Sequence, residues 1–111
     1  MIFVSPAMNR LAEAKQLFLD ALAAQEKGDL ERAEGLYRKA LTLAPERPSV
    51  MINLAAVLVQ LNKCAEAKLL CERLLEINPQ DAVALLNLGN SQLKLNATEE
   101  ALVSYERALS I

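Results

Sequence analysis

Histidine is absent from this 111-residue sequence, and so is tryptophan. Without histidine, the chain cannot build a Ser-His-Asp or Cys-His nucleophile, an imidazole general base or a histidine-ligated zinc site. The acidic side chains are distributed as expected for solvated helix faces rather than gathered into one site. We therefore predict that the chain is not an enzyme and that it holds neither a metal ion nor a cofactor.

Glycine and proline are scarce, with three and four copies respectively, and aromatic residues make up only 4% of the chain. So few turn-forming residues leave little material for hairpins, which excludes an all-β fold and a collagen-like one. Alanine and leucine together occupy 40 of the 111 positions. Because both residues are strong helix formers, the composition favours an all-α protein.

Neither sign of charge dominates, since 12 Lys and Arg residues face 14 Asp and Glu residues. A net charge of −2 with scattered lysines does not indicate a nucleic-acid partner. No apolar stretch approaches the roughly 20 residues that span a bilayer, so we expect no membrane segment. The apolar run Met1–Val4 is too short for a signal peptide, and the default prediction is a cytoplasmic protein.

Only two cysteines are present, Cys64 and Cys71, and they lie seven residues apart in a stretch that reads as helix. Their Cα atoms would then be about 10 Å apart, beyond the ~7 Å that a disulfide allows. We interpret them as buried or half-buried thiols in a reducing compartment. A redox sensor is the alternative, with only the nearby Lys63 and Lys68 to lower a thiol pKa.

The sequence repeats itself with a period of 34 residues, and such a period indicates a stack of similar structural units. The aligned sets include Ala33, Ala67 and Ala101; Leu41, Leu75 and Leu109; and Tyr37, Cys71 and Tyr105. So many coincidences at one offset make chance a poor explanation.

Each unit is predicted to contain two helices joined by a short turn. The first helix begins near Pro6, behind Ser5, and ends at the turn Lys27-Gly28-Asp29, where Asp29 caps the next helix. The other five helices are expected at Leu30–Leu43, Pro48–Leu61, Cys64–Ile77, Ala82–Leu95 (capped by Asp81) and Glu99–Ser110. Six helices with short connections make an antiparallel all-α stack.

Small residues explain how paired helices could approach each other closely. They recur early in each second helix and midway along each first helix, as Ala33, Ala67 and Ala101 and as Ala21, Ala55 and Gly89.

This pattern resembles the tetratricopeptide repeat over residues 14–111. The residues that carry the resemblance are Leu85, Leu88-Gly89, Ala101, Tyr105 and Ala108 in the third unit; Met51, Leu54-Ala55, Ala67 and Pro79 in the second; and Gly28-Asp29, Ala33, Tyr37, Ala40 and Pro45 in the first. Asp20, where leucine is usual, and Cys71, where an aromatic residue is usual, depart from the pattern.

The resemblance implies a right-handed α-solenoid of three helix-turn-helix repeats. The repeats would cover 14–47, 48–81 and 82–111, the last being incomplete, with 1–13 as an N-terminal extension of the first helix and no capping helix.

The resemblance also implies a concave groove, lined by the first helices, for a peptide or a partner segment. The residues carried over to this groove are Phe18, Leu22, Ile52, Asn53, Ala56, Val59, Leu86, Asn87, Asn90 and Leu93. Chaperone-tail-binding members of the family use a carboxylate clamp of basic residues. Because Phe18, Ser49 and Val83 stand at those places, we do not expect a C-terminal carboxylate ligand.

Asparagine recurs in the expected groove, with Asn53 and Asn87 at the same position of adjacent repeats and Asn90 one turn further on. An amide can pair with both the C=O and the N–H of an extended peptide backbone. These runs resemble the repeats of O-GlcNAc transferase-type glycosyltransferases, which line their groove in this way. The alternative is that asparagine is merely tolerated at a solvated position.

The last expected helix carries apolar residues that no further helix covers: Leu102, Val103, Tyr105, Leu109 and Ile111. Terminal repeats normally need a polar outer face or a capping helix. Either the chain is a fragment of a longer protein, or a homodimer buries this face. We favour the fragment and expect the isolated chain to self-associate.

The sequence thus predicts a scaffold that binds an unidentified protein or peptide. Two alternatives stay open: an N-terminal recognition module of a larger enzyme, such as a protein glycosyltransferase, and a self-association module. Helical repeats serve too many partners for the fold to decide among these functions.

Overall fold

A computed structural model describes residues 5–111, so the first four residues of the expected N-terminal extension lie outside the described residues. Within the described residues the chain forms six helices and no strand. They are α1 (Pro6–Glu26), α2 (Leu30–Leu43), α3 (Pro48–Gln60), α4 (Cys64–Ile77), α5 (Ala82–Lys94) and α6 (Thr98–Leu109). The predicted all-α class is confirmed, and each predicted helix end lies within one residue of the observed end.

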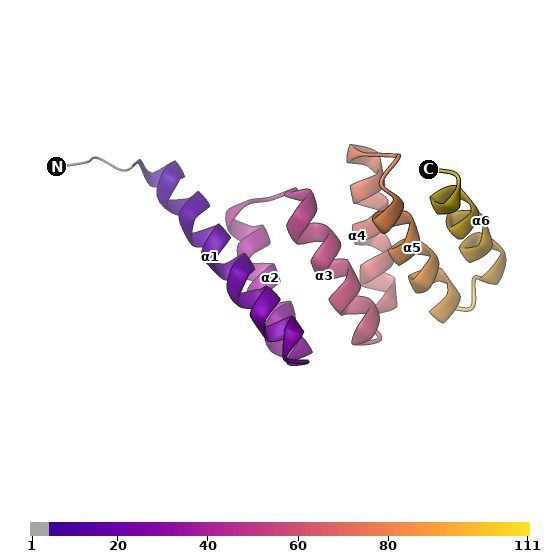
Figure 1. Cartoon of the computed structure of the whole chain (residues 1–111), viewed down its shortest axis with the longest axis horizontal. Coiled ribbons are helices and arrows are strands. Elements are labelled where there is room, and N and C mark those ends of the chain that lie inside the picture. Colours follow the sequence, from indigo (N-terminus) through magenta and orange to yellow (C-terminus); the bar gives the residue numbers. More distant parts are fainter. Residues whose placement is uncertain (1–4) are drawn as a thin grey trace.

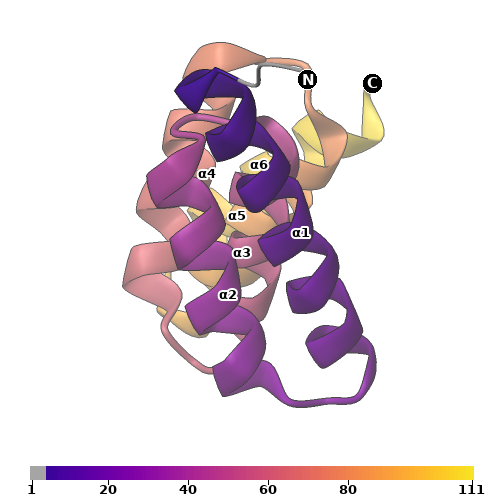
Figure 2. The same ribbon diagram turned by 90° about the vertical axis from the view of Figure 1, so that its left-hand side faces the viewer.

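The six helices follow one another along an elongated molecule with extents of 58 × 28 × 19 Å. Each helix packs against the next, and α3 also contacts α5 across the connection between their pairs. In Figure 1 α1, α3 and α5 lie nearer to the viewer, with α2 and α4 behind them, and Figure 2 shows the stack from the α1 end. The architecture is an α-solenoid of three helix pairs.

The turn inside each pair places one residue in the left-handed backbone region, and these residues recur every 34 positions. Gly28, Asn62 and Asn96 have φ angles of 81°, 63° and 66°. Glycine and asparagine tolerate this region best, and each is followed by an N–H that reaches back to the helix, as from Asp29 to the Ala24 carbonyl at 2.9 Å. The turn chemistry therefore ends every first helix at the same register.

Side-chain caps fix the starts of three helices. The Ser5 hydroxyl accepts from the Met8 N–H at 3.2 Å, Asp29 from Arg32 at 3.3 Å, and Asp81 from Ala84 at 3.0 Å. Each cap satisfies a backbone N–H that the first helical turn leaves without a partner. Asp29 and Asp81 thus perform the capping role predicted from the sequence.

The helices of each pair meet through the predicted small residues. Ala21, Ala33, Ala55 and Ala67 are completely buried, and Ala101 and Gly89 are buried as well. Larger buried residues complete the core, chiefly Tyr37, Met51, Leu54, Leu58, Leu74 and Leu85. Asp20, the departure from the repeat pattern, stays outside this core: its exposed carboxylate accepts a hydrogen bond from Gln16 at 3.0 Å.

Gly89 on α5 lies directly against the ring of Tyr105 on α6. A Cβ atom added to Gly89 would stand 2.6 Å from Cε1 of the Tyr105 ring, which is closer than real carbon atoms approach. The Tyr105 hydroxyl donates to the Asn90 side-chain oxygen at 2.6 Å and holds the ring over the glycine. In the first pair the equivalent tyrosine, Tyr37, donates to Gln25 instead. The position of Gly89 is held there by Ala21, whose Cβ fits into the completely buried site.

Substituting Gly89→Ala should therefore destabilise the protein, because the Tyr105 ring must move away from Asn90. We expect the free energy of unfolding to fall by roughly 1–2 kcal/mol in urea titrations. Gly35→Ala is the matched control, because Gly35 lies within α2 and nothing stands within 4 Å of its added Cβ. That control should gain up to about 1 kcal/mol from helix propensity. Equal stabilisation by both substitutions would contradict the packing described for Gly89.

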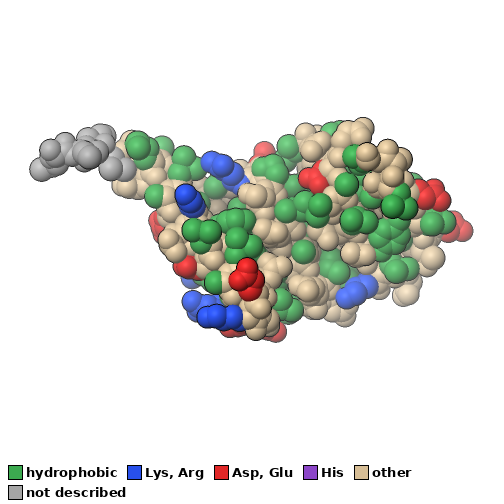
Figure 3. Space-filling model, viewed as in Figure 1, with side chains coloured by type: hydrophobic (Ala, Val, Ile, Leu, Met, Phe, Trp, Pro, Cys, Tyr) green, Lys and Arg blue, Asp and Glu red, His purple; other side chains and the backbone are tan. Residues whose placement is uncertain are grey.

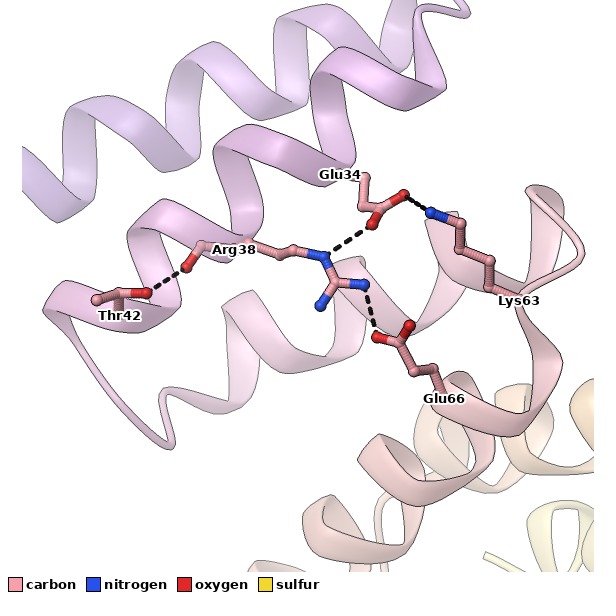
Figure 4. A network of polar contacts seen from close by, with 5 residues as sticks. All are labelled: Glu34, Arg38, Thr42, Lys63 and Glu66. Atoms are coloured by element: carbon pink, nitrogen blue, oxygen red, sulfur yellow. Dashed lines mark hydrogen bonds and ion pairs between the residues drawn. The ribbon is translucent and has the colours of Figure 1, made fainter.

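Ion pairs join the second helices of the first two pairs (Figure 4). The Glu34 carboxylate accepts from Arg38 on the same helix at 2.7 Å and from Lys63 at the start of α4 at 2.8 Å. Arg38 also donates to Glu66 on α4. Only 12% of the Glu34 side chain is exposed, whereas its partners are about half exposed. The hydrogen bond from Lys63 is the main cause that lowers the pKa of Glu34, and burial opposes it.

Because the pKa of Glu34 is lower in the folded chain, its ion pairs stabilise the fold above the unfolded pKa of about 4.3. This stabilisation is lost as the pH falls through the folded value. We expect the wild type to lose roughly 1 kcal/mol more than Glu34→Gln between pH 6 and pH 3 in urea titrations. Parallel losses in the two proteins would show that the network contributes nothing.

Candidate functional site

The ten residues predicted to bind a peptide all lie on α1, α3 and α5, and we call the surface of these three helices the first-helix face. Their exposure differs considerably. Leu86, Asn90 and Leu93 are exposed, Val59 is buried, and the half-buried remainder are Phe18, Leu22, Ile52, Asn53, Ala56 and Asn87. With 8% of its surface exposed, Val59 belongs to the core and offers little area for contact.

The first-helix face is apolar towards the α5 end. Leu86 and Leu93 are 43% and 49% exposed, and Val83 on the same helix is also exposed. Figure 3 shows hydrophobic side chains distributed across this face, with a few charged groups among them. Isolated exposed leucines are ordinary, but several on one helix face are typical of an interaction surface.

The asparagines occupy different hydrogen-bonding states. The Asn87 amide nitrogen donates to the Ile52 carbonyl on α3 at 3.5 Å, and the Asn90 oxygen accepts from Tyr105. The Asn53 side chain forms no hydrogen bond with another described residue, although Asn53 is half-buried. Asn53 therefore retains its full donor and acceptor capacity, while Asn87 retains its oxygen and one N–H.

Polar side chains of α5 tie it to the backbone of α3, which the sequence reasoning missed. Besides Asn87, the Lys94 ammonium donates to the Val59 carbonyl in the last turn of α3 at 3.1 Å. A cation is favourable there because the last carbonyls of a helix carry partial negative charge. Both pairs are 35 residues apart, one more than the repeat, so each donor bonds to the residue just before its own counterpart in the preceding repeat.

A cleft of about 280 Å³ lies between the start of α1 and the start of α3. Its lining consists of Leu11, Ala14, Lys15, Phe18, Ala44, Arg47, Ser49 and Val50. Figure 3 shows basic side chains at the upper left of the face, in the region between these two helices. Phe18 belongs to the predicted groove, whereas the positions of Arg47 and Leu11 beside it were not predicted from the sequence.

The face of α6 is uncovered within the described chain, as predicted. Leu109 is 85% exposed, whereas its counterparts Leu41 and Leu75 in the earlier repeats are partly buried against the core. Leu102, Val103 and Ile111 are also exposed. Tyr105 differs from the expectation of a bare residue, because its ring packs over Gly89 and is half-buried.

The remaining chemistry of the described chain is limited. No group of three or more His, Cys, Asp or Glu residues within 5–111 could hold a metal ion. Both cysteines are free and buried, and burial raises the pKa of the Cys71 thiol to about 12, so that it stays protonated. None of the helices described is both long enough and apolar enough for a bilayer crossing.

Solved structures with similar folds include peptide-binding domains. The first TPR of Spaghetti (RPAP3), bound to the HSP90 peptide SRMEEVD, is 26% identical over 89% of this chain and 79% of that chain, with a TM-score of 0.84. The second TPR of the same protein, bound to the same peptide, is 19% identical over 96% and 97%, with a TM-score of 0.85. The Sgt2 TPR domain from Aspergillus fumigatus is 24% identical over 88% and 65%, with a TM-score of 0.82.

The sequence itself matches two models of the tetratricopeptide repeat, one over residues 24–82 and the other over residues 70–103. No curated protein matches it. The first of the two models covers more than half of the chain, and the helix pairs, with turns that recur every 34 residues, agree with it. The chain therefore belongs to the tetratricopeptide repeat family.

Proposed function

We propose that the chain binds a peptide or an extended partner segment along the first-helix face and performs no catalysis of its own. Its fold is that of a protein–protein interaction module. The support from similar structures is that two RPAP3 domains of this fold hold an HSP90 peptide. The first of these shares 26% of its residues with this chain, which is too few to carry over the peptide itself.

The observation that carries the proposal is the exposed apolar surface of α5 beside polar amides. Covering a leucine completely stabilises a complex by roughly 1.5–3 kcal/mol, and Leu86 and Leu93 are both about half exposed. Asn87 and Asn90 lie on the same helix and can satisfy the backbone of a bound segment. Apolar contacts would then provide affinity while the amides prevent unpaired backbone groups.

Asn53 and Asn87 are the residues that we propose for backbone recognition. Adjacent packed helices lie about 8–10 Å apart, which corresponds to roughly three residues of extended chain. Asn53 is unengaged and Asn87 keeps one oxygen and one N–H, so each could pair with a peptide unit. Such pairing would be independent of the partner's sequence, and the apolar side chains would select the register.

The partner is expected to differ from a chaperone tail held by its terminal carboxylate. The places of the carboxylate clamp hold Phe18, Ser49 and Val83, none of which carries a positive charge. Recognition along the first-helix face would therefore depend on apolar side chains and on the side-chain amides of the asparagines.

Self-association is the second candidate function, and the uncovered face of α6 favours it. Leu102, Val103, Leu109 and Ile111 are exposed together at one end of the stack. A second copy could bury them, in which case the apparent mass would rise with concentration. Recognition on the first-helix face would persist when this end is made polar.

The test begins with selection of random linear peptides on the immobilised chain, followed by affinity measurements on one enriched peptide. Replacing Leu86 and Leu93 by serine should weaken binding at least tenfold, because the apolar contact area is lost. Asn53→Ala should weaken it about fivefold. Leu69→Ser is the control, since Leu69 is an exposed leucine on α4, outside the first-helix face, and its substitution should leave the affinity unchanged.

Circular dichroism of each variant confirms that the helices are retained. Enrichment of no peptide would refute the proposal. An enriched peptide that is lost with Leu69→Ser, yet retained when Leu86 and Leu93 are changed, would place recognition on the opposite surface.

A further inference from the structure

The cleft between α1 and α3 is a feature of the first-helix face that the proposed function leaves unassigned. Its volume of about 280 Å³ is just below the range of ~300–1,000 Å³ that is typical of small-molecule pockets. A cleft of this size accommodates one bulky side chain rather than a cofactor. It lies at the α1 end of the face, next to Phe18, which also belongs to the expected groove.

Apolar residues form the walls of this cleft. Leu11, Ala14 and Phe18 are spaced three and four residues apart and therefore share one face of α1. Val50, in the first turns of α3, and Ala44, just after α2, complete the walls. Ala14, Ala44 and Val50 are buried and form the floor of the cleft. Leu11 is exposed at its edge.

Two positively charged side chains lie at the opening of the cleft. Lys15 and Arg47 both line the cleft, and neither forms an ion pair with a described residue. The neighbouring carboxylate of Glu46 is directed to Arg73 on α4 at 3.4 Å. The amino end of α3 adds partial positive charge through the backbone dipoles of the helix. Arg47, the residue before this helix, forms no capping hydrogen bond with its side chain. An apolar cleft with this rim is complementary to an apolar group that carries a carboxylate beside it.

We propose that the cleft takes a bulky apolar side chain of the bound partner, and that a carboxylate of the adjacent Asp or Glu pairs with Lys15 and Arg47. The proposal rests on the proposed function, since it specifies which segment the first-helix face prefers. The occupant is thus an acidic peptide segment with an apolar anchor. Because the cleft lies at one end of the face, the anchor would fix the register and direction of the segment.

The experiment uses the same selection of random linear peptides. We expect enriched sequences to contain Leu, Met or Phe next to Asp or Glu. Removing the rim charges with Lys15→Gln and Arg47→Gln together should weaken such a peptide about 5- to 10-fold and reduce the salt dependence of binding. Filling the cleft with Ala14→Leu should weaken it more than tenfold.

The matched control is the pair Arg32→Gln and Lys39→Gln, two exposed cations on α2 that should leave the affinity unchanged. Two further peptides separate the possible sources of the carboxylate. Replacing the acidic residue by its amide should reproduce the loss seen with the rim variant, whereas amidating the peptide's C-terminus should have no effect.

The possible results separate the two proposals. Enriched peptides with no acidic bias, unaffected by the rim and cleft variants but weakened by changes at Leu86 and Leu93, would overturn this inference and leave the proposed function intact. Enrichment of no peptide would overturn both. Loss of self-association in the rim variant, without any effect on a peptide, would show that a second copy occupies the cleft and would also overturn the inference.

Discussion

The close approach of paired helices at alanine and glycine is the constraint on which the rest of the structure depends. Ala21 and Ala33, Ala55 and Ala67, and Gly89 and Ala101 are all buried at equivalent positions of the three pairs. Such residues bury little area, so they contribute close shape complementarity rather than a large hydrophobic term. The bulky buried residues, such as Met51, Leu54 and Leu58, fill the spaces around these contacts and join the pairs into one core.

This division of the apolar residues has a consequence for the surface. Hydrophobic residues make up 53% of the chain, and the mean hydropathy is +0.17. A stack 19 Å thin along its shortest axis has limited interior, and part of this hydrophobic content therefore remains exposed. Part of it lies on α5 and at the start of α1, where we propose that a partner binds, and part on the outer face of α6. Two further exposed apolar side chains, Leu69 and Ile77, lie on α4.

The repeat period made the fold predictable because each unit contains the same turn chemistry. Gly28, Asn62 and Asn96 stand 34 residues apart, and each ends a helix in the left-handed region. The period does not specify how one pair is rotated against the next. The Lys94 contact with α3 and the opening between α1 and α3 both depend on that rotation. For this reason the sequence identified the helices that carry the candidate site but neither the cleft nor the role of Arg47.

The cross-links between α3 and α5 give the first-helix face a defined geometry in this structure. Asn87 donates a hydrogen bond to the Ile52 carbonyl, near the middle of α3. Lys94 donates another to the Val59 carbonyl, in the last turn of α3. A face organised in this way would lose less conformational entropy on binding a partner than a mobile one.

Peptide binding along the first-helix face is tested most directly by a map of the backbone amide NMR signals of the ¹⁵N-labelled chain during titration with a selected peptide. We expect the shifted signals to cluster on α1, α3 and α5 and to include Asn53 and Asn87. Signals that shift mainly on α2, α4 or the outer face of α6, with those of the first helices unmoved, would contradict it.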